Sequence, residues 1–422
     1  MRRLTAFFTA LCLFALTVIG IHNYSMDAIA MNNGSFSTWP AKCKFESPTA
    51  LRANMNENTM PVFGSSEFQH GLTTKYHPMT MFKDCQFRPM LIGAGYYQSL
   101  GHAITLGAIS SELKGRKVVI LLSPTWFRKG GVKDKAFASR FSESSYIDMI
   151  KSPNVPDSVK DYIAARTQKL LAVDETTLNR IREYTPDKEP EKYSKTWLYR
   201  EFLKERQVQG VVLEAAAWGI FKNPESVESG RIGETLARRV MKGLGKLKAR
   251  ESSLKISRVP RGNEKLNKKY NSKNWESLAE EADKWAEVNC NNPFYMSKLG
   301  YFLCRFKMKG GPKPLKDVDC YVESEEYDDF RAFLDICKAN DIKPLIVELP
   351  VNGYWYEYQG YPKETRVKYY EKIKELAGEY GYPVEDLSGY EFEKYFFADA
   401  VHPDGKGWVK VNEIVYNYYK EG

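Results

Sequence analysis

The sequence predicts an α/β fold in which helices cover both faces of a mostly parallel β-sheet, in three layers. Apolar, β-branched segments alternate with amphipathic helical segments near both ends of the 422-residue chain, a pattern typical of parallel α/β sheets. The clearest strand is residues 117–123, a continuous apolar run that follows charged residues. Between about residues 140 and 300 the sequence is charged, helical in period and poor in β-type runs. The pattern of residues 140–300 therefore predicts a large helical insertion.

The N-terminus predicts a transmembrane anchor over residues 1–22. Arg2 and Arg3 precede the 18 uncharged residues from Leu4 to Ile21. A helix of that length spans about 27 Å, close to the about 30 Å of a hydrocarbon core. Because positive charge stays on the cytoplasmic side, we expect a single-pass protein of the cell membrane with its domain on the extracytoplasmic face.

A cleaved signal peptide is the alternative for this segment, because Ala28 and Ala30 have the small-x-small spacing of a cleavage site. Residues 23–58 are rich in Asn, Ser and Thr, and we expect them to form an irregular tether. Residues 59–422 are then the extracytoplasmic domain, with the helical insertion at about 140–300.

The composition is that of a globular protein whose aromatic residues suit a wet, partly apolar binding cleft. Hydrophobic residues make up 43% and charged residues 27%, while aromatic residues reach 14% and include 27 tyrosines. The formal net charge is +9, and residues 231–269 contain 13 Lys/Arg against 3 Asp/Glu. This run is either a solvated helical face or a platform for an anionic partner. No nucleic-acid-binding motif is present, so a phosphate-rich envelope polymer or an anionic lipid surface is favoured over nucleic acid.

Seven cysteines occur in the sequence, without a CxxC pair or a Cys/His cluster of zinc spacing, so no structural metal site is expected. Cys12 lies in the anchor. The other six could form three disulfides, with Cys290 and Cys304 as one conceivable pair, or remain buried thiols.

Strand and helix signals can be placed along the chain from periodicity and from Gly/Pro punctuation. Strands are predicted to end at Phe63 and to cover residues near 91, 117–123, 343–349 and 383–387. Helices are predicted near residues 99–113, 159–178, 197–222, 234–247, 325–340, 364–380 and up to about 419. Residues 350–356 are predicted to form an aromatic loop at the carboxyl end of a strand.

The first candidate for chemistry is the turn after the first strand, where Gly64 is followed by Ser65, Ser66 and Glu67. Gly accepts backbone angles that a Cβ forbids, so it allows a sharp turn that exposes a serine Oγ and its amide together. That is the geometry of an acyl-transfer nucleophile. Gly-Ser-Ser is also a common loop sequence, and the local residues do not choose between an ordinary turn and a nucleophile.

The second candidate lies more than 330 residues further along, at Asp399 and His402. Their spacing of three brings the two side chains to one face of a turn. The carboxylate can then accept from one imidazole nitrogen while the other nitrogen takes a proton from a serine. The alternative is that Asp399 and Asp404 are turn and cap residues and that His402 has no chemical role.

These motifs together resemble the SGNH/GDSL-type esterases and acyltransferases, in which a serine near the start and Asp-x-x-His near the end form the site. The whole chain more closely resembles the DltD family of teichoic acid D-alanylation. The resemblance rests on the N-terminal anchor, Gly64-Ser-Ser-Glu, Leu91-Ile-Gly-Ala-Gly, Ser123-Pro-x-Trp-Phe, Pro350-x-Asn-Gly-x-Trp-Tyr and Asp399-Ala-Val-His with Lys406-Gly-Trp. It implies an SGNH-hydrolase-like three-layer fold.

The resemblance implies that Ser66 is the nucleophile, with Ser65 at the position of the Asp in the SGNH pattern. His402 would be the general base and acid, and Asp399 its orienting partner. The Ser66 amide and the glycine loop at Gly93 and Gly95 would form the oxyanion hole.

The resemblance leaves the roles of two further groups of residues open. The Asn of the usual third SGNH block has no clear match, and Gln98 or Asn352 could replace it. Trp126, Tyr354 and Trp355 would line the cleft, or alternatively pack in the core.

The implied function is the transfer of D-alanyl groups onto (lipo)teichoic acid, outside a Gram-positive membrane and without a cofactor. The implied partners are the teichoic acid polymer, a DltB-like membrane-bound acyltransferase, the D-alanyl carrier system and the membrane. Two alternatives remain from the residues alone. One is an envelope esterase, thioesterase or O-acetyltransferase of the same fold, and the other is a non-catalytic protein that positions a membrane-bound acyltransferase.

Overall fold

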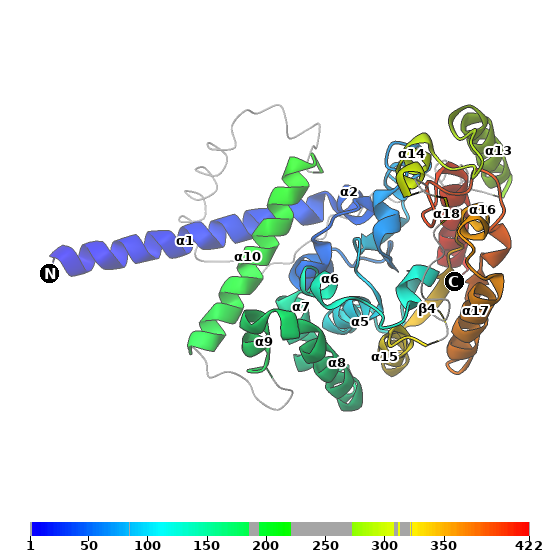
Figure 1. Cartoon of the computed structure of the whole chain (residues 1–422). Helices are drawn as coiled ribbons and strands as arrows, with labels where there is room; N and C mark the ends of the chain where they lie inside the picture. Colours follow the sequence, from blue (N-terminus) through cyan, green and yellow to red (C-terminus); the bar gives the residue numbers. More distant parts are fainter. Residues whose placement is uncertain are drawn as a thin grey trace, which may run out of the picture.

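The computed structural model describes residues 2–83, 85–184, 194–220, 272–307, 311–312, 321 and 323–421 (Figure 1). The basic run at 231–269, the helix expected at 234–247 and Cys320 lie outside the described residues. Among the described residues, no disulfide bond joins Cys290 to Cys304.

Five parallel strands form one sheet in the order β2-β1-β3-β4-β5. Their bounds are Thr59–Phe63 (β1), Arg88–Ile92 (β2), Lys117–Leu122 (β3), Lys343–Glu348 (β4) and Val384–Asp386 (β5). The predicted fold class is confirmed. Strand order reverses between β1 and β3, and in such sheets ligands bind beyond the carboxyl ends of the strands at that point.

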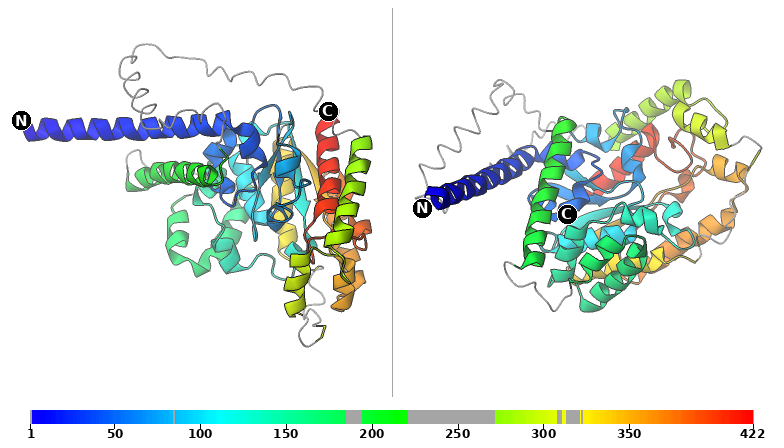
Figure 2. Two further views of the ribbon diagram at one scale, coloured as in Figure 1. Left: turned by 90° about the horizontal axis from the view of Figure 1, so that it is seen from above. Right: turned by 60° about the vertical axis from the view of Figure 1, so that its left-hand side comes forward.

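Alternate strand residues enter two separate hydrophobic clusters, because successive side chains of a strand point to opposite faces. On β3, Val118 and Ile120 belong to one cluster, whereas Val119 and Leu121 belong to the other. Helices on the first face include α5 (Ser99–Ala108), α7 (Glu143–Lys151), α15 (Glu326–Ala339) and α17 (Lys363–Gly378). Helices α13 (Ser272–Asn289) and α18 (Gly405–Lys420) cover the second face (Figure 2).

The N-terminal helix α1 (Arg2–Met31) projects from the body as a long rod (Figure 1). Within the described part of the chain, it is the one helix long and apolar enough to cross a membrane, over Arg3–Ala30. No part of its most apolar window is buried against the other described residues. The helix is therefore compatible with a single-pass anchor.

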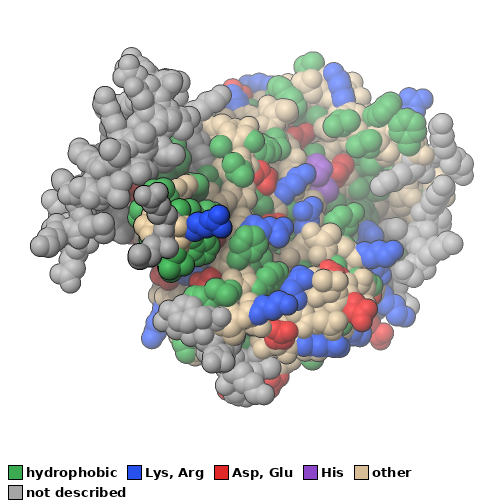
Figure 3. Space-filling view, turned by 90° about the vertical axis from the view of Figure 1, so that its left-hand side faces the viewer, with side chains coloured by type: hydrophobic (Ala, Val, Ile, Leu, Met, Phe, Trp, Pro, Cys, Tyr) green, Lys and Arg blue, Asp and Glu red, His purple; other side chains and the backbone are tan. Residues whose placement is uncertain are grey.

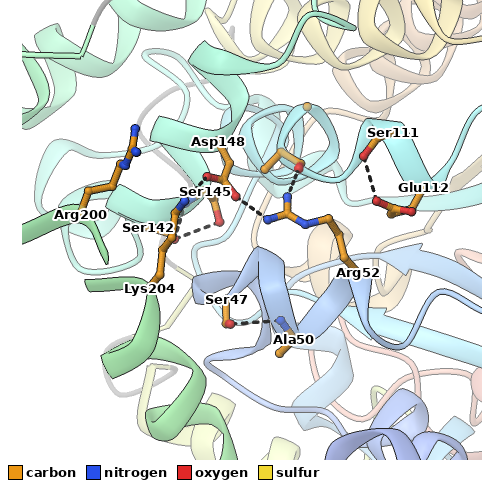
Figure 4. Close-up of polar contacts among 12 residues, drawn as sticks. Ser47, Ala50, Arg52, Ser111, Glu112, Ser142, Ser145, Asp148, Arg200 and Lys204 are labelled. Atoms are coloured by element: carbon orange, nitrogen blue, oxygen red, sulfur yellow. Dashed lines mark hydrogen bonds and ion pairs between the residues drawn. The ribbon is translucent and has the colours of Figure 1, made fainter. Parts of the chain in front are cut away.

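The expectation of an irregular tether is wrong for residues 24–52. After α1 come α2 (Asn33–Thr38), η1 (Lys44–Glu46) and α3 (Pro48–Arg52), and Trp39 and Phe45 are fully buried. Arg52 donates to the Ala108 carbonyl at 2.6 Å and pairs with Asp148 at 2.6 Å (Figure 4). Widely spaced aromatic residues in this polar segment pack into the core. The average composition of the segment is polar, so it does not reveal them.

The region between β3 and β4 is helical where it is described, and it packs into the same core as the sheet. Ile163, Leu178 and Val211 share a cluster with strand residues. The remaining helices of this region are α6 (Asp134–Ala138), α8 (Asp157–Leu170), η5 (Leu171–Val173), α9 (Glu175–Ile181), α10 (Lys195–Ala217) and α14 (Lys298–Lys307).

Short helices complete the structure at the ends of strands. The residues predicted as an aromatic loop contain α16 (Gly353–Tyr358), because Asn352 caps its first turn by accepting from the Trp355 amide at 3.0 Å. The others are η2 (Ser66–Gln69), α4 (Pro78–Met81), η3 (Ser110–Glu112), η4 (Pro124–Phe127) and η7 (Ser388–Tyr390).

Candidate active site

The turn after β1 is held by its own motif residues. A Cβ on Gly64 would lie 2.3 Å from Glu67 Oε1, so a larger residue there would displace the Glu67 side chain. The buried Glu67 carboxylate accepts from the Ser65 amide at 2.5 Å. Burial raises the pKa of Glu67 to about 7, although this hydrogen bond acts to lower it. Ser65 points inward and donates through Oγ to the Ala94 carbonyl at 2.9 Å. Ser66 is thereby left facing outward at the carboxyl end of β1.

Ser66, His402 and Asp399 form a continuous hydrogen-bonded chain. Ser66 Oγ lies 2.7 Å from His402 Nε2, and His402 Nδ1 lies 2.8 Å and 2.9 Å from the two carboxylate oxygens of Asp399. A neutral imidazole that accepts from Ser66 Oγ carries its proton on Nδ1, where the carboxylate accepts it. The arrangement can remove a proton from Ser66 and stabilise the resulting imidazolium.

The Asp399 loop is fixed by backbone contacts as well as by its side chain. Asp399 Oδ1 accepts from the amides of Val401 at 2.9 Å and His402 at 3.1 Å. Burial opposes ionisation of this carboxyl, but hydrogen bonding to His402 and the charges of His402 and His70 hold its pKa below the ordinary range. Asp399 is therefore a carboxylate at neutral pH.

Helix α14 and the residues just before it support the same loop. Ser297 Oγ donates to the Ala398 carbonyl at 2.7 Å. A Cβ on Gly300 would lie 1.9 Å from that carbonyl oxygen and 3.0 Å from Asp399 Cβ. On the other side, the Asn352 amide donates to the Ala400 carbonyl at 2.9 Å. The loop is thus clamped between α14 and the start of α16.

His70 is a fourth member of the cluster that the sequence analysis did not single out. Its ring is stacked on that of His402, with centroids 3.7 Å apart and planes at 6°. Its Nδ1 donates to the Ser66 carbonyl at 2.8 Å, and its Nε2 lies 3.5 Å from Asp399 Oδ2. Burial and the neighbouring charge of His402 lower the pKa of His70, whereas the negative charge of Asp399 acts to raise it. A Ser-x-x-x-His spacing on a helical turn is the signal that could have predicted it.

His70, Asp399 and His402 each offer a ligand atom within a small volume. The two imidazole rings lie in nearly parallel planes, however, and a ring nitrogen coordinates along its own plane. Their lone pairs therefore do not converge on one point. The geometry favours a hydrogen-bonded cluster over a shared metal ion.

The glycine loop after β2 lies beside Ser66. A Cβ on Gly95 would lie 3.7 Å from Ser66 Cβ, and one on Gly93, whose φ is +144°, would lie 1.7 Å from the Gly64 carbonyl oxygen. Ser66 is the first residue of η2, so its amide is one of the N-terminal donors that have no acceptor within the helix. Gln98 is the N-cap residue of α5, and its Oε1 is buried without a partner in the described part of the chain.

Two of the expected cleft residues, Trp126 and Trp355, pack in the core, and the oxyanion candidate Asn352 has other hydrogen-bond partners. Trp126 is 3% exposed and packs on His102, and Trp355 is 7% exposed and packs on Phe294. Asn352 uses its side chain to cap α16 and to donate to the Phe294 carbonyl at 2.9 Å. The core-packing alternative therefore describes both tryptophans, and Asn352 positions the Asp399 loop rather than reaching Ser66.

The comparison with known proteins agrees with the motifs from which this site is built. A family model described as DltD protein matches residues 38–420. The chain belongs to the DltD family. The match covers every residue of the candidate site, from the Ser66 turn to His402, so the predicted family resemblance is confirmed.

Three curated DltD-family relatives span most of the chain. A protein DltD of Bacillus subtilis (strain 168) is 27% identical over 392 residues, covering 89% of each chain. A protein DltD of Staphylococcus aureus (strain NCTC 8325 / PS 47) is 24% identical and covers 85% of this chain and 81% of its own. A protein DltD of Lacticaseibacillus rhamnosus is 25% identical, with 87% and 78% covered.

Proposed function

We propose that the chain is a membrane-anchored, extracytoplasmic serine acyltransferase that transfers D-alanyl groups onto teichoic or lipoteichoic acid. The observation that carries this proposal is the chain of contacts from Ser66 Oγ through His402 to Asp399. Membership of the DltD family, which takes part in teichoic acid D-alanylation, directs the choice of acyl group and polymer.

In the first half-reaction His402 Nε2 takes the proton of Ser66 Oγ, which attacks the carbonyl carbon of a D-alanyl donor. Negative charge then develops on the carbonyl oxygen. The Ser66 amide and the glycine loop at Gly95 are the candidate donors to that oxygen, and one such donor contributes about 3 kcal/mol in the transition state. His402 passes its proton to the leaving group, and a D-alanyl ester remains on Ser66.

In the second half-reaction a hydroxyl group of the polymer replaces the leaving group. His402 removes the hydroxyl proton, the oxygen attacks the D-alanyl ester, and Ser66 Oγ regains the proton as it departs. Asp399 remains an anion throughout and stabilises His402 when it is charged. One base can therefore serve both half-reactions of this ping-pong mechanism.

The membrane location provides the supply of substrate. Arg2 and Arg3 precede the apolar part of α1, which favours an extracytoplasmic domain. The acyl donor would reach Ser66 from the D-alanyl carrier system through a DltB-like membrane-bound acyltransferase. The teichoic acid polymer is the acceptor.

The test is D-alanine ester content of teichoic acid in cells that express Ser66→Ala, His402→Ala or, as a matched control, Ser139→Ala, which alters an exposed serine outside the site. We expect the first two variants to lose D-alanylation at normal protein levels and the control to retain it. Mass spectrometry of the wild-type chain, quenched during turnover, should find a D-alanyl adduct on the peptide that contains Ser66. Normal D-alanylation by Ser66→Ala would support the non-catalytic positioning role instead.

Hydrolysis is the second candidate, because Ser66 is only partly buried and water can compete with the polymer hydroxyl. The same purified chain separates the two activities. Release of free D-alanine at an unchanged rate when a polyol acceptor is added would identify an esterase or thioesterase, whereas formation of the polyol ester identifies a transferase.

A further inference from the structure

Helix α10 lies against the last turns of α1, where α1 enters the body (Figure 1). His22 Nδ1 is 2.5 Å from Glu205 Oε2, and Ser25 Oγ donates to Gln209 Oε1 at 2.9 Å. His22 directly follows the uncharged run of α1. The middle of α10 is therefore level with the end of the segment that would cross the membrane.

The two contacts also set the direction of α10. Moving from His22 to Ser25 on α1 corresponds to moving from Glu205 to Gln209 on α10, so both helices advance away from the membrane end together. In Figure 1 the helix crosses α1 obliquely, and its N-terminal half, near α9, extends toward the side of the body from which α1 projects. Phe202 and Leu198 lie about 5 and 10 Å along α10 from Glu205 in that direction.

The outer side of α10 carries large apolar side chains that are exposed. The exposed fractions are 53% for Leu198, 61% for Phe202 and 69% for Leu213. Leu198 and Phe202 are four residues apart and so share one face of the helix. Lys195 and Arg206 are exposed on the same side, an arrangement of apolar and basic residues that is typical of helices in a membrane interface.

The opposite side of α10 is attached to the body. Leu203, Val208 and Val211 are buried, and Lys204 pairs with Asp148 of α7 at 3.8 Å, with Arg200 nearby (Figure 4). Hydrophobic and basic side chains are also spread over the face from which α1 projects (Figure 3). The exposed stripe is thus a surface with a defined position relative to both the anchor and the domain.

We propose that the N-terminal half of α10 enters the outer membrane–water interface, with Leu198 and Phe202 among the lipid acyl chains and Arg206 at the anionic headgroups. The occupant of this surface is the lipid itself, because the contacts with His22 and Ser25 place the stripe level with the outer end of the apolar part of α1. Contact at two separate helices fixes the orientation of the domain, since a single helix would leave it free to rotate about α1. The proposal rests on the placement of α1 across the membrane.

The test places a photoreactive residue at the stripe. The full-length chain with Phe202→p-benzoylphenylalanine is reconstituted in vesicles of phosphatidylglycerol and phosphatidylcholine and irradiated, and intact-mass measurement identifies the adduct. Val288→p-benzoylphenylalanine is the matched control, because Val288 is 74% exposed on α13. We expect lipid adducts at position 202, a preference there for phosphatidylglycerol, and no lipid adducts at position 288.

A third variant, Leu13→p-benzoylphenylalanine, reports on α1 by itself. Lipid adducts at position 13 without any at position 202 would overturn the proposal and leave the anchor in place. Absence of lipid adducts at both positions would refute the membrane placement of α1. A cross-link from position 202 to another protein in native membranes, in place of lipid, would also overturn the proposal and identify the stripe as a protein-docking surface.

Discussion

The imidazole rings of His70 and His402 are stacked face to face, 3.7 Å between centroids and 6° from parallel. His70 is fixed by its hydrogen bond to the Ser66 carbonyl, and its Nε2 lies 3.5 Å from Asp399 Oδ2. A proton on both rings would place two cations in contact. Because the pKa of His70 is lowered by burial and by His402, His70 is neutral when His402 takes the serine proton.

Replacement of His70 tests whether the stack positions His402. Removal of the ring in His70→Ala should lower kcat about two- to tenfold with little change in KM, since an aromatic stack contributes about 0.5–1.5 kcal/mol. His70→Phe keeps the ring and should recover most of that loss. The measurement is steady-state D-alanyl transfer, and a wild-type kcat for His70→Ala would show that the stack has no positioning role.

Asp399→Asn should remove most of the activity and leave the fold unchanged. The Asn carbonyl oxygen can still accept from the Val401 and His402 amides, which Asp399 Oδ1 accepts in the wild type. The amide nitrogen at the Oδ2 position presents a donor to His402 Nδ1, which favours the wrong tautomer, and the neutral side chain no longer stabilises the imidazolium. We expect kcat to fall by on the order of 10³–10⁴, with an unchanged circular dichroism spectrum. A loss of less than tenfold would argue against the proposed role of Asp399.

Gly93→Ala should prevent formation of the site. The φ of Gly93 is +144°, and a Cβ would lie 1.7 Å from the Gly64 carbonyl oxygen, at the point where the glycine loop meets the Ser66 turn. We expect a loss of about 3 kcal/mol or more in the free energy of unfolding, measured by denaturant titration. Gly389→Ala is the control, because nothing lies within 4 Å of its Cβ position. Equal stability of the two variants would contradict the close approach of the two loops.

Glu348 should make the protein less stable as pH rises. The side chain is fully buried, and neither carboxyl oxygen has a partner in the described part of the chain. Burial and the negative charge of Asp386 raise the pKa of Glu348 from 4.5 to about 9, and the positive charge of Lys374 opposes this shift. The native state thus keeps a proton that the unfolded state loses between those two values. The stabilising effect of that proton is complete below about 4.5 and is lost progressively as pH rises toward 9, by at most about 1.4 kcal/mol per pH unit.

Glu348→Gln cannot ionise and should remove this dependence. Thermal melting of the full-length chain between pH 5 and 9 should show a smaller decrease in Tm for Glu348→Gln than for the wild type. Glu385→Gln, on the exposed side of β5, should behave as the wild type. Parallel pH profiles for wild type and Glu348→Gln would refute the assignment.

Much of the secondary structure could be predicted because local periodicity determines it. The buried strand at β3 and the helix at α15 follow from continuous β-branched and amphipathic runs, within a residue or two of their observed ends. The N-terminal segment could not be predicted in this way. Phe36, Trp39 and Phe45 are isolated in a polar sequence, and their burial depends on surfaces contributed by helices far along the chain.

The sequence by itself determined the α/β fold, the apolar anchor, the family and the separate Ser66 and Asp399/His402 motifs, because each is written in local spacing or motif order. Only the tertiary structure decided which side chains meet. It placed Ser65 inward on Ala94 and Ser66 outward on His402, brought His70 onto the His402 ring, and buried Trp126 and Trp355 among core side chains. The physical reason is that parallel strands bring distant segments to one sheet edge, and the contacts made there depend on packing that neither segment encodes alone.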